Sequence, residues 1–229
     1  MTETIGGTNG SGTVMLTHGH ARLALHTLRP GEGRPLLFLH GLGEQAPATV
    51  PDHLDAWTGP VCALDLTGHG ASTRPRGGGY TAEILMADVD AALQHLGTAT
   101  IYGRGLGGYL ALLAAGARPD AVQGVIIGDG PGLVGGGIRP TTPLLGSPHV
   151  DGLPGPDPFV LLEMSRDVRP PDYVVEFVRL LHRGTDVEVP ISVCAIVRPE
   201  WLVAVLEEAG DRAVVGPVDE ALERYAAVS

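Results

Sequence analysis

Short apolar runs alternate with segments of helical periodicity along most of the chain, and this alternation restricts the possible folds more than any other feature. The runs Pro35–Leu39, Val61–Leu66 and Val122–Ile127 are almost continuously apolar, which is typical of strands buried on both faces. Between them, Thr81–Leu96 places apolar residues at helical spacing, and Leu106–Ala117 is apolar nearly throughout. The pattern predicts an α/β fold in which a mostly parallel sheet carries helices on both faces.

The remaining segments extend this pattern into a single predicted domain. We expect residues 13–229 to form it, with residues 1–12 as a flexible tail. Residues from about 130 to 189 are expected to form a short lid, because Gly130–Pro158 is rich in glycine and proline and has no clear period. Further expected strands are Thr13–Leu16, His20–Leu28, Thr100–Tyr102, Ile191–Val197 and Ala213–Val215, and further expected helices are His53–Thr58, Pro158–Met164, Pro171–Arg183, Pro199–Ala209 and Pro217–Val228.

The composition argues against several classes of function. Acidic residues outnumber basic ones by 26 to 15, and the resulting charge of −11 disfavours nucleic acid and anionic membranes as partners. All basic residues are arginine, so no Schiff-base or P-loop lysine exists. Cys62 and Cys194 lack zinc-binding spacing, so we predict no metal and no cofactor. Neither a signal peptide nor a membrane-spanning apolar stretch is apparent, so the expected location is cytoplasmic.

Three short motifs each follow a predicted strand. Leu-His-Gly-Leu-Gly occupies residues 39–43, and Asp-Leu-Thr-Gly-His-Gly-Ala-Ser occupies residues 65–72. Gly-Arg-Gly-Leu-Gly-Gly, at residues 103–108, joins a strand to the apolar helix. In this order the motifs resemble those of the α/β-hydrolase fold family. The resemblance is sharp from Pro35 to Asp129 and extends as a looser pattern from Thr13 to Val228.

The third motif resembles the family's nucleophile elbow, Gly-x-Ser-x-Gly. The resemblance places Gly105 at the nucleophile position. Glycine has no side chain that can attack a carbonyl carbon, so no acyl-enzyme can form there. The family's turn has a positive φ, which glycine adopts at little steric cost. We therefore expect the glycine to relax the fold and to leave room for a water molecule where a hydroxyl would have been.

The other positions of a serine triad, as the resemblance implies them, agree with this interpretation. The family's acid follows the seventh strand or sometimes the sixth; Glu200 is the only acid near the first place, and Asp129 occupies the second. The family's histidine follows the last strand, but residues 214–219 contain none, and the last histidine of the chain is His182. An acid without a histidine or a nucleophile cannot complete acyl transfer, because nothing shuttles the proton.

The oxyanion hole is the part of the site that the resemblance implies is retained. It needs only backbone N–H groups, here those of Leu42 and Leu106, and the positive end of the helix beginning at Leu106 points to the same place. We therefore predict a site that holds a carbonyl or carboxylate group without cleaving the molecule. The predicted ligand-binding residues are His40, Gly41, Leu42, Arg104, Gly105, Leu106 and Asp129.

Several of these side chains also have a purely structural interpretation. Arg104 is either an anion-binding group or part of an ion pair behind the elbow; we favour the ion pair, because side chains before the elbow usually point away from the cleft. His40 and His69 are better interpreted as hydrogen-bonded pins of their loops than as catalytic groups. Asp129 fits a ligand-facing acid and a cap of the following turn equally well.

Three functional hypotheses follow. The leading one is a non-catalytic binder of a small carbonyl- or carboxylate-containing ligand or of a protein partner. The second is an enzyme, either a hydrolase of esters or amides with a non-serine mechanism or a lyase or cyclase, using water, Asp129 or lid residues. The third is a structural subunit whose fold serves as an interaction surface. The sequence leaves homo-oligomerisation open.

Overall fold

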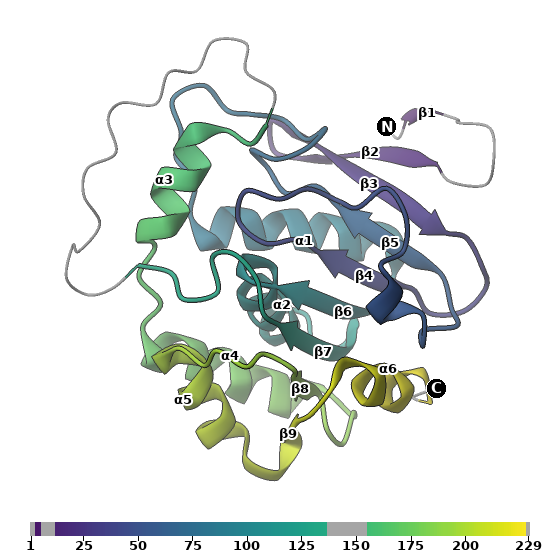
Figure 1. Ribbon diagram of the computed structural model, residues 1–229, viewed down its shortest axis with the longest axis vertical. Helices are drawn as coiled ribbons and strands as arrows, with labels where there is room; N and C mark the ends of the chain where they lie inside the picture. Colours follow the sequence, from purple (N-terminus) through teal and green to yellow (C-terminus); the bar gives the residue numbers. More distant parts are fainter. Residues whose placement is uncertain (1–2, 6–11, 137–154, 228–229) are drawn as a thin grey trace.

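The computed structural model describes residues 3–5, 12–136 and 155–227. Within them, one sheet runs in the order β1-β2-β3-β5-β4-β6-β7-β8-β9 (Figure 1). The pairings from β1 to β3, and from β3 to β5, are antiparallel, and all pairings from β5 to β9 are parallel, so the predicted mostly parallel sheet is confirmed. The strands are β1 (Glu3–Ile5), β2 (Thr13–His18), β3 (Ala21–Arg29), β4 (Leu36–Leu39), β5 (Val61–Leu64), β6 (Ala99–Arg104), β7 (Val122–Gly128), β8 (Ile191–Val193) and β9 (Ala213–Val215).

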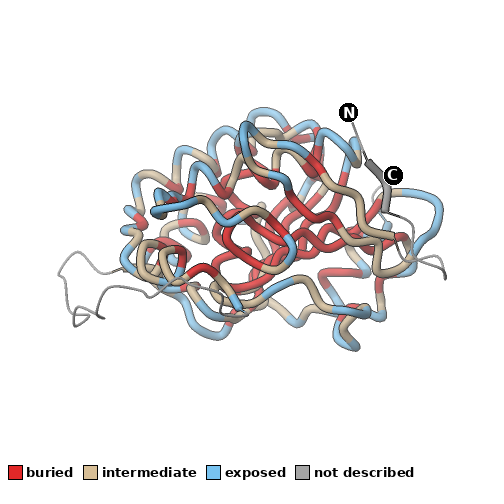
Figure 2. The backbone as a smooth tube through the Cα atoms, turned by 90° about the horizontal axis from the view of Figure 1, so that it is seen from above, coloured by how far each residue is buried: buried red, intermediate tan, exposed pale blue. Residues whose placement is uncertain are grey.

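Helices cover both faces of the sheet, and the buried residues lie between these layers (Figure 2). One face packs against α1, α2, α4 and α5, and α4 lies against both α2 and α5. The opposite face is covered by α6 and the short 3-10 helix η1. The helices are η1 (Asp52–Leu54), α1 (Ala82–Leu96), α2 (Leu106–Ala117), α3 (Pro158–Arg166), α4 (Pro171–Gly184), α5 (Glu200–Ala209), η2 (Gly210–Arg212) and α6 (Val218–Ala226).

Strand β4 illustrates why the apolar runs become central strands. Side chains alternate across a strand, so Leu37 and Leu39 enter the core under α2, whereas Leu36 and Phe38 enter the core under α6. All four are buried, so both faces contribute apolar burial. A strand of this kind needs helices on both sides, as the sequence predicted.

Residues at the two ends of helix α1 determine where it begins and ends. The Thr81 hydroxyl accepts a hydrogen bond from the Ile84 amide and caps the start of α1. At its end, Gly97 adopts a φ of +82°, which stops the helix. Helix α2 begins at Leu106 directly after the turn at Gly105 and spans the predicted residues. The turn and the helix therefore form one unit at the carboxyl end of β6.

Two predicted elements are shorter than expected. The helix predicted at His53–Thr58 is only the single turn η1, because Pro51 precedes it and Gly59 and Pro60 follow closely. The strand predicted at Ile191–Val197 ends at Val193. Beyond it, the Ile196 and Val197 amides donate to the Asp129 carboxylate instead of a neighbouring strand. A side chain from β7's loop thus overrides the local strand preference.

The predicted tail and the predicted lid each contain regular secondary structure. Within the predicted tail, Glu3–Ile5 forms β1 and pairs with β2. The predicted lid contributes α3 and α4, while its residues 137–154 lie outside the described part of the chain. None of the helices in the described residues is both long and apolar enough to span a bilayer.

Candidate functional site

The turn between β6 and α2 has the sharp geometry that the sequence predicted for an elbow. Gly105 adopts a φ of +58° and a ψ of −123°, and its amide donates to the Gly128 oxygen at 3.0 Å. The backbone here is thus in a conformation that strongly favours glycine. A Cβ atom added to Gly105 would lie 2.1 Å from the Pro131 carbonyl oxygen. The position therefore excludes a side chain for two reasons: backbone conformation and crowding.

The two amides predicted as an oxyanion hole converge as expected, but the chain itself occupies them. The Leu42 and Leu106 amides both donate to the Pro131 carbonyl oxygen, each over 2.9 Å. One oxygen that accepts two backbone N–H bonds is the arrangement an oxyanion hole provides for a substrate. The extra room expected at Gly105 is consequently absent, because the Pro131 carbonyl group fills it. That expectation was wrong.

Residues 130–132, which we call the plug, fit this place because they carry little side-chain volume. A Cβ atom on Gly130 would lie 2.8 Å from the Gly105 amide nitrogen. Gly132 has a φ of +77°, and a Cβ atom there would lie 2.7 Å from that of Leu42. The plug and the elbow therefore fit together only as a set of glycines around one proline.

His40 and His69 are both buried, and their hydrogen bonds hold the motifs at residues 39–43 and 65–72 in place. This arrangement supports the structural interpretation of both histidines. His40 Nδ1 donates to the Gly41 oxygen at 2.8 Å, while Nε2 accepts from the Leu66 amide at 3.2 Å. His69 Nδ1 lies 3.2 Å from the Thr67 oxygen, and Nε2 accepts from the Gly43 amide at 3.1 Å. Burial, and then the neighbouring His40 ring, lower the pKa of His69 to about 3.

Asp65 organises the loops around the same strand ends. Its carboxylate accepts from His26 Nε2 at 3.0 Å and from the amides of Ala46 and Ala71 at 2.7 Å and 2.8 Å. Burial alone would raise its pKa, but these hydrogen bonds, first that from His26, hold it below its usual value. Asp65 is therefore a structural anion rather than a proton donor.

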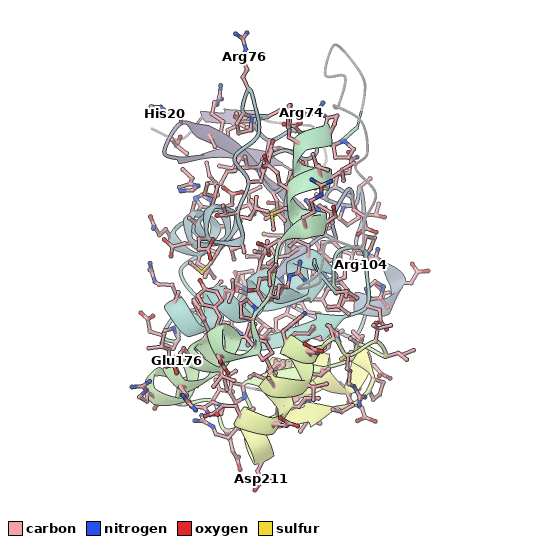
Figure 3. All side chains as sticks on the ribbon, turned by 90° about the vertical axis from the view of Figure 1, so that its left-hand side faces the viewer. His20, Arg74, Arg76, Arg104, Glu176 and Asp211 are labelled. Carbon is pink, nitrogen blue, oxygen red and sulfur yellow. The ribbon has the colours of Figure 1, made fainter. Side chains whose placement is uncertain are left out.

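Arg104 forms the predicted ion pair. Its Nη1 lies 2.9 Å from Glu44 Oε1, and its Nε donates to the Asp129 backbone carbonyl oxygen at 3.4 Å. The other Glu44 oxygen accepts from the Gly41 amide at 2.9 Å. In Figure 3, Arg104 lies alongside the strand ends, whereas Arg76 and Asp211 point outward at the two extremes of the molecule. Arg104 thus links two turns.

Asp129 is a cap rather than a free acid in this arrangement. Its Oδ2 accepts from the Ile196 amide at 2.7 Å, and its Oδ1 accepts from the Val197 amide at 3.1 Å. Both oxygens are engaged with the loop that follows β8. This loop presents Ile196 and Val197 to solvent, with 88% and 53% of their surfaces exposed. Asp129 therefore fixes an apolar, solvent-facing loop.

A small pocket lies directly beside the plug. Its volume is about 260 Å³, and it is lined by Leu42, Gly130, Ser165 and residues 132–135. The Leu133 carbonyl, at its wall, accepts from Arg169 Nη1 at 2.5 Å and from Trp201 Nε1 at 2.9 Å. Across the described residues, no group of three or more metal-binding side chains gathers at this or any other place.

Comparison with known proteins agrees with the observed fold. A family model described as "alpha/beta hydrolase fold" matches residues 34–143. A thioesterase domain from the curacin biosynthetic pathway superposes with a TM-score of 0.66 over 96% of this chain and 98% of that chain, at 17% identity. The chain has the α/β-hydrolase fold.

Two curated proteins are similar to part of this α/β-hydrolase-fold chain. One is (E)-2-((N-methylformamido)methylene)succinate hydrolase of Acinetobacter baylyi, 31% identical over 113 residues. The other is esterase Rv0045c of Mycobacterium tuberculosis, 33% identical over 109 residues. Each match covers 46% of this chain, and they cover 41% and 36% of the two relatives. The chain thus matches less than half the length of either relative.

The residues that define this α/β-hydrolase-fold site only partly match those named from the sequence. All seven predicted residues lie at the carboxyl edge of the sheet, as the motifs indicated. The residue that sequence reasoning missed is Pro131, whose backbone oxygen occupies the hole. The sequence analysis also missed Arg169 and Trp201, which donate to the carbonyl oxygen of Leu133, the residue after the plug. The available signal was the run Gly130-Pro131-Gly132 directly after Asp129, the residue that follows β7.

Proposed function

We propose that this protein is a non-catalytic member of the α/β-hydrolase fold that acts by binding. The observation that carries the proposal is the Pro131 carbonyl oxygen, which accepts from both oxyanion-hole amides beside Gly105. Acyl transfer needs a nucleophile and free donors for the developing oxyanion. Here the nucleophile position has no side chain, and the donors are engaged. The two curated relatives are named as a hydrolase and an esterase. This chain matches only part of the sequence of each, so these names do not by themselves assign it hydrolysis.

The enzyme alternative depends on Asp129 or a lid residue acting on water. A general base needs a carboxylate oxygen within hydrogen-bond reach of that water. Both Asp129 oxygens already accept backbone hydrogen bonds from the loop after β8. Abstracting a proton would therefore compete with holding this loop. This arrangement supports the binding proposal over the enzyme alternative.

The ligand we propose is a small carbonyl or carboxylate compound. The pocket beside the plug, about 260 Å³, is slightly below the usual range for drug-sized ligands, which favours a fragment-sized compound. Leu42 lines the pocket and also supplies one hole amide. A compound seated there would lie next to Leu42, whose amide is one of the two hole donors.

A protein partner is the second candidate, and a different observation favours it. Ile196 and Val197 are exposed β-branched residues on a loop that Asp129 holds in place. Adjacent exposed apolar residues on a fixed loop are typical of an interaction surface. If the partner is a second copy of this chain, sedimentation should detect self-association that Ile196→Ser/Val197→Ser abolishes. A monomer at all concentrations would exclude the second copy.

The non-catalytic proposal is tested by assaying turnover and labelling together. We expect no hydrolysis of short p-nitrophenyl esters above the buffer rate and no labelling by a serine-directed fluorophosphonate probe. The Asp129→Ala variant provides the control, because it removes the acid directly after β7. Hydrolysis that saturates with substrate and disappears in Asp129→Ala would establish the enzyme alternative instead.

A further inference from the structure

The plug places its own carbonyl group where a ligand's carbonyl would bind. The Pro131 oxygen lies 2.9 Å from each of the Leu42 and Leu106 amide nitrogens, and Gly132 packs against the Leu42 side chain. A compound can reach these two amides only after the Pro131 oxygen has left them. The plug is therefore an internal competitor for any carbonyl or carboxylate ligand of the hole.

The plug is anchored one residue further along, at Leu133. Its carbonyl oxygen accepts from two buried donors, Arg169 Nη1 and Trp201 Nε1. The Arg169 guanidinium lies over the Tyr109 ring, 4.3 Å from its centre, and the Trp201 ring meets the same tyrosine edge-on. These contacts belong to α2, α5 and the segment before α4. The closed position thus depends on donors outside the plug.

The anchor is incompletely satisfied, which limits the stability of the closed position. Arg169 Nε and Nη2 are buried and make no hydrogen bond within the described residues, although Nε forms an ion pair with Asp167 Oδ2 at 3.7 Å. A buried charged group with unmade hydrogen bonds destabilises the state that buries it. Burial also lowers the pKa of Arg169 to about 10. The closed position therefore rests on an anchor whose hydrogen bonds are only partly made.

We propose that the plug is a gate that alternates between the two hole amides and an open position, and that a small carboxylate or carbonyl compound binds the amides in the open state. This inference rests on the proposed binding function and adds its regulation. The apparent dissociation constant then equals the intrinsic one divided by the open fraction. Weakening the Leu133 anchor should raise that fraction and tighten binding.

Trp201→Phe tests the gate, because it removes the indole donor and keeps an aromatic ring against Tyr109. Trp57→Phe is the matched control, since Trp57 Nε1 donates to the Pro60 oxygen at 3.2 Å in a buried site away from the plug. NMR hydrogen exchange of the Leu42 and Leu106 amides reports the open fraction. Loss of one hydrogen bond should speed exchange about five- to tenfold in Trp201→Phe and leave both amides unchanged in Trp57→Phe.

Titration with sodium butyrate then tests the competition. We expect butyrate to shift the Leu42 and Leu106 amide signals, with an affinity about five- to tenfold higher in Trp201→Phe than in the wild type. Equal exchange rates in all three proteins, or faster exchange with no butyrate-dependent shift of these amides, would overturn the gate. Arg169→Met removes the other Leu133 donor and serves the same purpose if Trp201→Phe does not fold. Ester turnover by the wild type would contradict the non-catalytic proposal alone, so the two failures are distinguishable.

Discussion

The loops after β4, β5 and β6 and those after β7, β8 and β9 share one edge of the sheet but are built differently. The first group is dense and buried: His40, His69 and Asp65 each make at least two hydrogen bonds to the turns around them. The second group ends in exposed apolar residues at Ile196 and Val197. Asp129 and the plug form the boundary, because the plug follows β7 yet packs into the first group.

The difference teaches that the turns of this fold have two separable roles. The first group holds strands and helices together through buried polar groups, so removing one would leave its partners unsatisfied. In the family that the sequence motifs resemble, the loops of the second group supply the acid and the histidine. Under the proposed binding function, the loops of the first group must be retained for stability, whereas those of the second group need not retain catalytic residues.

Gly105→Ser tests the tightness of the first group most severely. Gly210 has nearly the same backbone angles, φ +53° and ψ −127°, but open space around it, so Gly210→Ser is the matched control. The backbone strain should cost each variant about 1–3 kcal/mol. The collision with Pro131 should cost Gly105→Ser about 1–3 kcal/mol more. Urea unfolding measures both, and equal losses would mean that the plug moves aside freely.

Acidification should weaken the first group through His69. The folded protein keeps His69 neutral, with a pKa of about 3, whereas the unfolded chain takes up a proton below pH 6.5. Stability present above pH 6.5 is therefore lost as the pH falls toward 3, by about 2 kcal/mol at pH 5. Unfolding free energies at pH 7 and pH 5 measure the loss.

The His69→Gln variant isolates this histidine from the other titrating groups. Its stability should fall about 2 kcal/mol less than that of the wild type between pH 7 and pH 5. His20→Gln, at an exposed histidine, serves as the control and should keep the wild-type difference. Parallel profiles for His69→Gln and the wild type would show that His69 does not titrate on unfolding.

Asp129→Ala probes the boundary between the two groups. Loss of the carboxylate removes acceptors from the Ile196 and Val197 amides, which should cost about 1–2 kcal/mol. Asp129→Asn keeps one carbonyl oxygen and should fall between the two proteins. Thermal unfolding and hydrogen exchange at these two amides measure the effect. Unchanged exchange in Asp129→Ala would mean that something else fixes the loop.

Arg104→Gln should have the smallest effect. Its ion pair with Glu44 is partly exposed to solvent on both sides, and such pairs contribute less than about 1 kcal/mol. A double-mutant cycle with Glu44→Gln measures the coupling between the two side chains. A coupling well above that value would give Arg104 a larger role in holding the first group together.

The sequence predicted most of the scaffold because its signals are local. The Thr81 cap, the apolar helix from Leu106 and the positive φ of Gly105 each depend on residues next to them in the chain. The resemblance to the α/β-hydrolase fold followed from motifs that mark strand ends. The ion pair of Arg104 was predicted in kind, but its partner, Glu44, lies sixty residues away in sequence and was not identified.

What the sequence did not reveal depends on backbone atoms and tertiary competition. The occupant of the hole is a carbonyl oxygen, a group that every residue carries, so the small residues on either side of Pro131 are the only sequence signal for it. Strand β8 ends at Val193, and shortly beyond it the Ile196 and Val197 amides donate to the distant Asp129 carboxylate instead of continuing the strand. Which of these competing hydrogen bonds forms depends on the tertiary structure, and no periodic pattern in the sequence indicates it.

The contact between Gly105 and the Pro131 oxygen also constrains how this chain could change by mutation. A serine introduced at position 105 would meet that oxygen before it could meet any substrate. The loop would have to be displaced by an earlier substitution, which by itself restores no chemistry. Gaining a reactive hydroxyl at position 105 would therefore take two changes in a fixed order, and the first of them would bring no catalytic benefit.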